Sequence, residues 1–388
     1  MRSIELFAGA GGLGIGVSRA GFTPEAVLEW DRYCCDTIRE NRDRSLEPVA
    51  HWRVFHGDVR YFDYGQVSGQ IDLVSGGPPC QPFSLAGKHA GPLDDRDMFP
   101  EAVRAVRELK PKAFLIENVK GLTRQAFTSY LEYIRLQLTY PEIVARKCEA
   151  WTDHLARLER YHTQGRHDGL HYRLVMRLLN AADYGVPQKR ERVFLVGFRS
   201  DLDAEWCFPV PTHSEDTLLW AQWRTGEYWE RHQVPQRKRP DDEKARMRAL
   251  RLGEAPALLP WNTVRDALDG LPDPETDPAA AEMFLNHRFQ PGARSYPGHT
   301  GSPLDEPAKT LKAGDHGVPG GENMLRRPDG TIRYFSVRES ARLQTFPDDF
   351  LFHGSWTETM RQLGNAVPVT LAEVVARSIH SQLYGGTR

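Results

Sequence analysis

The sequence has little cysteine and no long apolar run. Its 388 residues include only five cysteines, at positions 34, 35, 80, 148 and 207, and no C-x-x-C pair. Neither a disulfide framework nor a zinc site is therefore predicted. No apolar run approaches the roughly 20 residues that cross a bilayer, and the start "MRSIELFAGAGG" is not a signal peptide. We expect a cytoplasmic protein with reduced thiols, no metal and no membrane partner.

An excess of charge of one sign is also lacking. The formal net charge is −2, so nucleic acid would have to bind to a local basic patch rather than to the whole surface. One candidate is the stretch 231–251, which holds eight Lys or Arg against three Asp or Glu. A solvated helix and loop is the more common explanation for a charge run of this kind.

What the first half does contain is an alternation of short apolar runs and helical stretches, which is typical of a parallel α/β sheet. Strands are predicted at 3–7, 25–31, 52–58, 71–77, 112–119 and 192–198, with a helix at 98–109. Each strand is apolar throughout, as strands covered on both faces are. Residues 121–180 are predicted to form a mostly helical insertion, with Trp151, Leu155 and Leu158 on one face.

The composition changes near residue 200, where Pro, Trp, Gly and charged residues become more frequent. Order returns near residue 334. Ser336 and Glu339 have the spacing of a capping box, and 367–383 forms an amphipathic helix pattern. We therefore predict one α/β domain over 1–199 and 356–388, and a smaller, irregular domain with its hinge over 200–355.

Gly9, Gly11 and Gly14 form a G-x-G-x-x-G pattern between a predicted strand and a helix. Such glycines let the backbone turn tightly and approach a ligand. Glu29 ends the next strand, where a carboxylate can bind ribose hydroxyls, and Asp58 ends the third. The pattern indicates an adenosine-type cofactor. Both NAD and S-adenosylmethionine fit it, and a purely structural glycine turn remains an alternative.

Cys80 lies in "GGPPCQPFSLAG", where three prolines in five positions exclude a regular helix or central strand. The segment is a stiff loop that presents the thiol. Cys80 follows one predicted strand and Glu117 closes another, so both belong to the sheet edge where open α/β sheets bind ligands. Alternation places Gln188, Arg190 and Arg192 on one side of a strand. Two such arginines suit a phosphate or carboxylate, although a surface Glu or an edge R-x-R is often merely solvated.

Taken together, these motifs resemble the DNA (cytosine-5)-methyltransferase family of the bacterial modification-enzyme type. The resemblance rests, in chain order, on "ELFAGAGGLGIG", "LEWD", "GGPPCQPFSLAGK", "ENV", "NAADYGVPQKRERVFLVGF", "RESARLQTFPDDF" and "QLGNAVPV". It implies a Rossmann-like domain that uses S-adenosyl-L-methionine and has a mostly parallel sheet. It also implies that the irregular domain recognises the target. The long segment between "ENV" and "NAADYG" departs from compact family members.

The resemblance also implies a mechanism. The enzyme flips a cytosine out of duplex DNA, Cys80 attacks C6 as a thiolate, and Glu117 bonds the ring near N3. C5 then takes the methyl group, and S-adenosyl-L-homocysteine is released. Arg190 and Arg192 are expected to lower the pKa of the thiol, and Gln188 is grouped with them as a catalytic residue.

The same resemblance assigns binding residues. The expected cofactor residues are Phe7, Gly9, Gly11, Gly12, Glu29, Trp30, Asp58, Val59, Pro79, Met98 and Asn365. The expected DNA contacts are Gln81, Ser84, Thr310, Arg237, Lys238 and Arg239. We expect a monomer, with a cognate restriction endonuclease that cuts the same site as a further partner.

Three other functions share part of this pattern. A tRNA cytosine-5 methyltransferase would use the same catalytic motifs, but the Cys-Phe-Thr tripeptide of that branch does not occur here. An NAD-dependent oxidoreductase would leave the Cys80 loop, "ENV" and "QKRER" unexplained. A non-catalytic binding module would have no need for Cys80 and Glu117.

Overall fold

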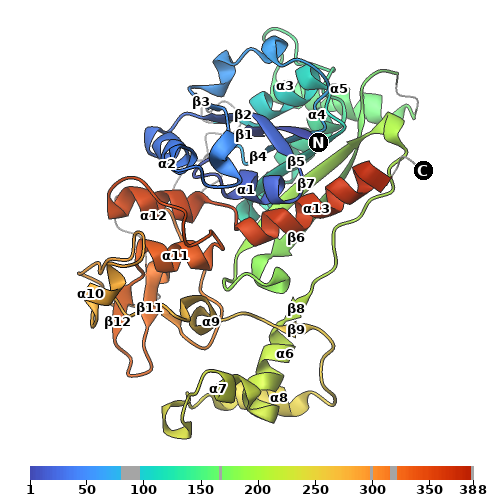
Figure 1. The fold of residues 1–388 in the computed structure, drawn as a ribbon. Coiled ribbons are helices and arrows are strands. Elements are labelled where there is room, and N and C mark those ends of the chain that lie inside the picture. Colours follow the sequence, from blue (N-terminus) through green and yellow to red (C-terminus); the bar gives the residue numbers. More distant parts are fainter. Residues whose placement is uncertain (80–96, 166–167, 298–299, 315–320, 386–388) are drawn as a thin grey trace.

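A seven-stranded sheet lies at the centre of the computed structural model (Figure 1). The structure describes residues 1–79, 97–165, 168–297, 300–314 and 321–385. The strand order is β3-β2-β1-β4-β5-β7-β6. Strands β1 to β5 run parallel and β7 is antiparallel to both its neighbours. The bounds are β1 Arg2–Leu6, β2 Thr23–Glu29, β3 Val54–His56, β4 Leu73–Gly76, β5 Ala113–Val119, β6 Tyr172–Asn180 and β7 Glu191–Arg199. The prediction of a mainly parallel α/β fold is confirmed.

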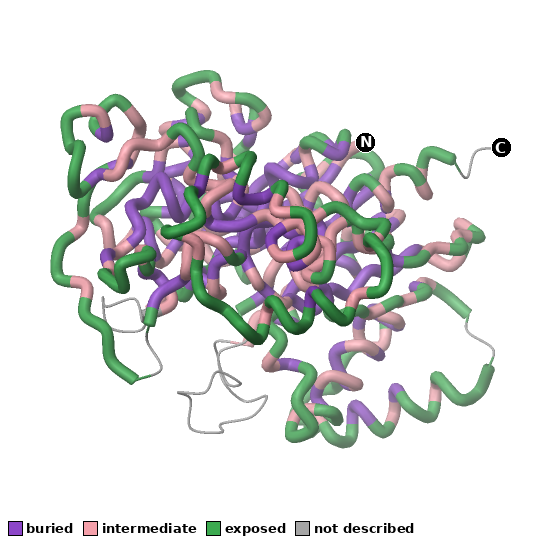
Figure 2. Tube along the Cα trace, turned by 90° about the horizontal axis from the view of Figure 1, so that it is seen from below, coloured by how far each residue is buried: buried purple, intermediate pink, exposed green. Residues whose placement is uncertain are grey.

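Helices cover both faces of this sheet. On one face lie α3 (Phe99–Leu109), α4 (Thr128–Thr139) and α5 (Trp151–Thr163), and their side chains pack on Ile4 and Phe114. On the other face α1 (Gly12–Arg19) and α13 (Val369–Gly385) lie side by side (Figure 1). A Cβ on Gly16 would come within 2.5 Å of Ala372 Cβ, so the two helices touch closely. Figure 2 shows the buried stretches concentrated in the middle of the molecule.

The prediction for 121–180 is wrong in its last part. Helices α4 and α5 form as expected, with Leu155 and Leu158 buried, but Tyr172–Asn180 is the edge strand β6. Leu174, Val175, Leu178 and Leu179 follow a spacing that an amphipathic helix shares. Pairing with β7 along the whole length of β6 decides for the strand. A single-sequence pattern does not contain that long-range partner.

The described residues from 213 to 335 form two smaller units below the sheet (Figure 1). The first, which we call the aromatic lobe (residues 213–261), packs Tyr228, Trp229 and Trp261 together. The second holds a three-stranded sheet, with Leu311, Leu325 and Phe335 buried. The bounds are β8 His213–Ser214, α6 Glu215–Trp220, α7 Glu227–Arg231, α8 Glu243–Arg251, β9 Leu259–Pro260, α9 Val264–Leu268, α10 Pro278–Ala281, β10 Ser302–Pro303, β11 Met324–Arg326 and β12 Ile332–Tyr334.

The chain then returns through α11 (Val337–Leu343) and α12 (Trp356–Asn365). The capping box at the start of α11 is present: Ser336 Oγ accepts from the Glu339 N–H, and the Glu339 carboxylate accepts from the Ser336 N–H. Phe346 and Leu363 pack with Trp52 beside α1. The division at 199/200 and 355/356 stays a prediction.

Candidate active site

The loop after β1 is bound to the end of β2 by one carboxylate. Glu29 accepts hydrogen bonds from the backbone N–H groups of Gly9 (2.7 Å), Trp30 (2.9 Å) and Asp31 (2.8 Å). Burial raises the pKa of Glu29, and these backbone donors oppose that rise. Gly9 has a φ of 55°, and a Cβ there would meet no atom within 4 Å. The loop therefore turns in a conformation that favours glycine and faces open space.

The residues around this loop fit an adenosine ligand. Trp30 is 72% exposed, next to the buried Glu29, and so offers a free indole face for stacking. Phe7 is partly buried, with a φ of 54°. The Asp58 carboxylate accepts hydrogen bonds from the backbone N–H and the guanidinium of Arg60. Val59, the next residue, is buried.

Three further expected cofactor residues lie at the ends of other elements. Asn365 is exposed at the end of α12. Pro79 is exposed, and its carbonyl accepts from the Met98 N–H at 3.4 Å at the start of α3. A Cβ on Gly12 would lie 2.4 Å from the Val367 carbonyl oxygen. The glycine at position 12 thus lets the cofactor loop approach the segment that follows Asn365.

Cys80, Gln81 and Ser84 lie outside the described residues, but the backbone that leads to them is described. Asn118 Nδ2 donates to the Pro78 carbonyl at 2.9 Å. A Cβ on Gly77 would lie 3.0 Å from Glu117 Oε2. The end of β5 therefore contacts the chain two to three residues before Cys80. Asn118 was not among the residues predicted from the sequence, and its position at a strand end beside Glu117 was the available signal.

Glu117 and Arg192 form a buried ion pair. Arg192 Nε lies 2.9 Å from Glu117 Oε1, and the residues are 9% and 7% exposed. Burial raises the pKa of Glu117, while Arg192 and Arg190 oppose the rise. Burial of two charges is costly, and a carboxyl whose pKa is perturbed at a sheet edge is a candidate for proton chemistry.

Gln188 and Arg190 have different partners from Arg192. Gln188 Nε2 donates to the Leu343 carbonyl at 3.1 Å, and its Oε1 accepts from the Leu311 N–H at 2.9 Å. Arg190 donates to three backbone carbonyls, those of Leu311, Gly364 and Ala366. Gln188 and Arg190 precede β7, which begins at Glu191, and the sequence did not predict these acceptors.

The comparisons with known proteins agree with this geometry. The family model described as "C-5 cytosine-specific DNA methylase" matches residues 1–140 and 153–381. The chain belongs to this family. The methylase is 32% identical to the type II methyltransferase M.PspPI of Psychrobacter sp. over 97% of this chain and 78% of that protein. It is 31% identical to M.NgoMIV of Neisseria gonorrhoeae over 97% and 96%, respectively.

Solved structures support the fold of the methylase. The chain is similar to a protein described as an Escherichia coli prophage-encoded DNA modification methyltransferase, with a TM-score of 0.61, 22% identity and 99% of both chains covered. It also resembles the Dnmt2 methyltransferase of S. pombe, with a TM-score of 0.54, 18% identity and both chains fully covered. The family resemblance inferred from the motifs is confirmed. The methylase is a DNA (cytosine-5) methyltransferase, and its family uses S-adenosyl-L-methionine.

The expected DNA contacts that fall within the described residues lie in two places. Thr310 Oγ1 donates to the Lys189 carbonyl at 2.7 Å, next to β7. Arg237 and Lys238 are exposed in a 3-10 turn, Gln236–Lys238, of the aromatic lobe. Arg239 lies over the Trp229 ring at 5.8 Å. The structure therefore places Thr310 beside the residues that precede β7 and the basic triplet on a separate unit.

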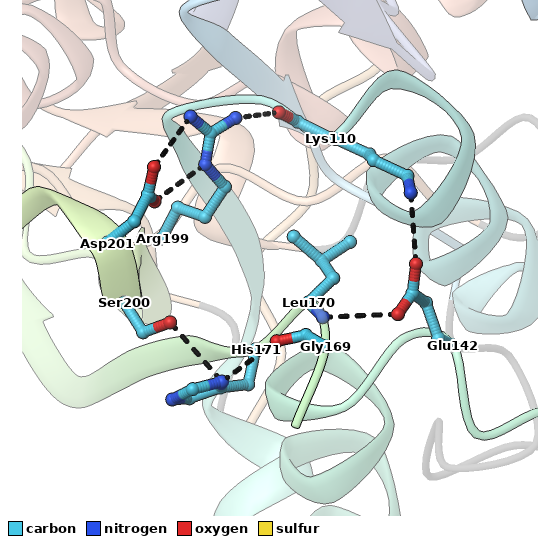
Figure 3. Close-up of a pocket in the computed structure, with 8 residues that line it drawn as sticks. All are labelled: Lys110, Glu142, Gly169, Leu170, His171, Arg199, Ser200 and Asp201. Carbon is cyan, nitrogen blue, oxygen red and sulfur yellow. Dashed lines mark hydrogen bonds and ion pairs between the residues drawn. The ribbon is translucent and has the colours of Figure 1, made fainter. Parts of the chain in front are cut away.

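A surface pocket of about 370 Å³ lies at the ends of strands β5 and β7 that are opposite to Glu117 (Figure 3). Lys110 precedes β5 and Arg199 ends β7, whereas Glu117 lies near the carboxyl end of β5. Lys110 pairs with Glu142 at 3.0 Å, and Arg199 with Asp201 at 2.7 Å. Its charged groups satisfy one another, and it is not the candidate active site.

Within the described ranges, no three His, Cys, Asp or Glu side chains are grouped so as to hold a metal ion. No helix in the described part of the chain is long and apolar enough to cross a membrane.

Proposed function

We propose that this methylase transfers a methyl group from S-adenosyl-L-methionine to C5 of a specific cytosine in duplex DNA, as the modification enzyme of a restriction–modification system. One observation carries the proposal. The buried Glu117–Arg192 pair lies against the backbone that leads to Cys80, at the same sheet edge as the Glu29 loop. Group transfer needs a cofactor site and a nucleophile side by side. The type II methyltransferases to which the chain is similar support the biological role.

The cofactor would be held by the 9–12 loop, Glu29 and Trp30, with Phe7, Asp58, Val59, Pro79, Met98 and Asn365 around it. Glu29 accepts three backbone hydrogen bonds, and a carboxylate has about four acceptor positions. One position is left for a ribose hydroxyl. S-adenosyl-L-methionine, when bound, supplies an electrophilic methyl group to C5 and leaves as S-adenosyl-L-homocysteine.

The chemistry assigned to this chain's own residues is acid-assisted covalent addition. The Cys80 thiolate forms a bond to C6, and the C5–C6 π electrons move toward the ring nitrogen and O2. Glu117, whose pKa is raised by burial, hydrogen-bonds at N3 and shares a proton there as negative charge develops, and the charge on Arg192 stabilises that developing anion. After methylation a solvent base removes the C5 proton, the C5=C6 double bond re-forms as the C6–S bond breaks, the thiolate leaves, and the proton shared at N3 returns to Glu117. Covalent addition is required because C5 of cytosine alone is a poor nucleophile.

The DNA side of the proposal uses base flipping, since a stacked cytosine cannot reach the sheet edge. Gln81, Ser84 and Thr310 would lie near the flipped base, and Arg237, Lys238 and Arg239 would contact phosphates. A monomer suffices for one hemisite. A cognate endonuclease would share the recognition sequence but needs no contact with the methylase.

The deciding experiment supplies the methylase with labelled S-adenosyl-L-methionine and either duplex DNA or tRNA, followed by bisulfite sequencing of the DNA. We expect label in DNA at one cytosine of a short recurring sequence. Cys80→Ala should show no transfer, whereas Cys148→Ala, at an exposed cysteine, should keep the wild-type rate. Label in tRNA alone would move the enzyme to the RNA-modifying branch.

A further inference from the structure

Residues 308–311 run alongside residues 187–190, about 120 positions earlier in the chain. The Ala308 N–H donates to the Pro187 carbonyl at 2.9 Å, and the Lys189 N–H donates to the Ala308 carbonyl at 2.8 Å. Thr310 Oγ1 adds a bond to the Lys189 carbonyl at 2.7 Å. We call residues 308–311 the docked segment. Three hydrogen bonds therefore tie the docked segment to residues 187–190, which we call the lead-in of strand β7.

Two buried side chains next to β7 hold both polar backbone groups of Leu311. Gln188 Oε1 accepts from the Leu311 N–H at 2.9 Å, and Arg190 Nη1 donates to the Leu311 carbonyl at 2.9 Å. Gln188 and Arg190 are fully buried. A buried polar side chain that lost these partners would incur a desolvation cost. The docked segment is therefore held at a fixed register along the lead-in of β7.

The other nitrogen of Arg190 reaches a third part of the chain. Nη2 donates to the carbonyls of Gly364 (2.7 Å) and Ala366 (2.8 Å), the two residues that flank Asn365 at the end of α12. A Cβ on Gly364 would lie 2.2 Å from the Ala313 backbone nitrogen. The end of α12 thus touches the chain just beyond the docked segment. Arg190 therefore links the docked segment to the backbone on both sides of Asn365, which is an expected cofactor residue.

Arg192 lies two residues further on, inside β7, and its partner is Glu117. The two arginines therefore have different structural roles. Arg192 meets a carboxylate at the reacting edge, whereas Arg190 meets three carbonyls from two segments. Such a set of acceptors requires the planar fork of a guanidinium, and a lysine ammonium of equal charge does not match it.

We propose that Arg190 is a positioning residue that fixes the DNA-recognition region against the active-site edge, and that it does not serve to lower the pKa of the Cys80 thiol. This inference rests on the proposed DNA methylation. A shift of about 1 Å in the docked segment would misplace the DNA relative to Glu117 and Cys80, and misplacement on that scale costs up to about 10²-fold in rate.

The test is Arg190→Lys, which keeps the charge and loses the fork. We expect amide hydrogen exchange at Ala308 and Leu311 to become at least about tenfold faster. We also expect KM for duplex DNA to rise and the single-turnover rate to fall at least about tenfold. The pH dependence of Cys80 alkylation should not change. Unchanged exchange, or an unchanged rate and KM, would overturn the proposal.

Arg338→Lys is the matched control. Arg338 is also a fully buried guanidinium that donates to three carbonyls, those of Leu285, Pro347 and Phe350. It should lower thermal stability in the same way and leave exchange at Leu311 and KM for DNA at wild-type values. Equal losses in both variants would mean a merely structural role and would overturn the proposal.

Two further measurements keep the test decisive. If Arg190→Lys does not fold, Thr310→Val removes one bond of the docked segment. It should change exchange and rate in the same direction by a smaller factor, and wild-type values would count against the proposal. A shift of Cys80 alkylation to higher pH, with normal exchange, would restore the electrostatic role. Should wild-type enzyme fail to methylate DNA, the proposed function fails, and exchange at Leu311 still tests the docking.

Discussion

The sheet edge and the aromatic lobe use charged groups in opposite ways. At the edge, Glu117, Arg192 and Arg190 are buried and each has defined partners. In the lobe, arginines lie over aromatic rings at or near the surface: Arg224 over Trp220 (5.0 Å), Arg246 over Trp223 (5.5 Å) and Arg231 over Tyr228 (5.6 Å). Buried charges fix a geometry strictly, while exposed cation–π contacts contribute about 0.5–1 kcal/mol each. Substitutions of the buried charged residues at the sheet edge should abolish activity. Substitutions of the exposed charged residues in the lobe should lower it only in part.

The largest expected effect is at Glu117. Glu117→Gln removes the acid and should lower the single-turnover rate by roughly 10²–10⁴-fold, the usual contribution of general acid catalysis. S-adenosyl-L-methionine affinity, measured by calorimetry, should stay near wild type. The control is Glu339→Gln, which breaks another buried pair, with Arg333, away from the edge. A full rate for Glu117→Gln would remove Glu117 from the acid role.

The lobe is compared with the sheet by removing one buried ring from each. Trp229→Ala and Phe114→Ala each delete a fully buried side chain and should cost about 3–5 kcal/mol. Trp229→Ala should unfold the lobe first and keep cofactor binding, since Ala182 is the one buried member of the Trp229 cluster that lies outside the lobe. Phe114→Ala should lose cofactor binding together with the main thermal transition. Loss of cofactor binding in both variants would show that the two regions unfold as one unit.

A third expected effect concerns a buried acid in the sheet. Burial raises the pKa of Glu5 to about 8, so the unfolded chain ionises this group first as pH rises. The stability that protonated Glu5 contributes is complete below its unfolded pKa near 4.5 and declines by up to about 1.4 kcal/mol per pH unit until pH 8. Glu5→Gln should therefore gain stability relative to wild type across that window, as measured by urea unfolding at several pH values.

Glu25 is a control whose pKa shift, and therefore whose effect of pH on stability, has the opposite sign to that of Glu5. Its hydrogen bond with Arg2 lowers the pKa of Glu25, so the contribution of the carboxylate is present above pH 4.5 and is lost as pH falls. Glu25→Gln should lose stability relative to wild type as pH rises from 3 to 5. Parallel pH profiles for the two variants would contradict the assignment of Glu5 as a protonated group.

The smallest expected effect is in the basic turn of the lobe. Arg237→Gln with Lys238→Gln removes two exposed charges and leaves Arg239 on Trp229. If both contact phosphates, the slope of log K for DNA against log salt should fall by about 1.8, or 0.9 per contact. Arg135→Gln on α4 should leave the slope unchanged. An unchanged slope in the double variant would identify the turn as a solvated surface.

Local patterns predicted most of the catalytic sheet, because its parallel strands are apolar runs bounded by glycine and acidic residues. They failed at β6, whose apolar spacing also fits a helix. They placed Gln188, Arg190 and Arg192 on one side of a strand, yet the acceptors of Arg190 lie 121 to 176 positions away and are backbone carbonyls. No residue type marks a carbonyl as an acceptor, so only the fold reveals the different role of Arg190.

Helix α13 also has a consequence for biosynthesis. It covers one face of a sheet whose first strand begins at Arg2, and it pairs closely with α1 through Gly16 and Ala372. While the chain is being made, that apolar face stays open until the residues near 385 have left the ribosome. Partly made chains expose such surface to chaperones and to aggregation. We therefore expect a chain released before α13 to expose that apolar face and to be short-lived.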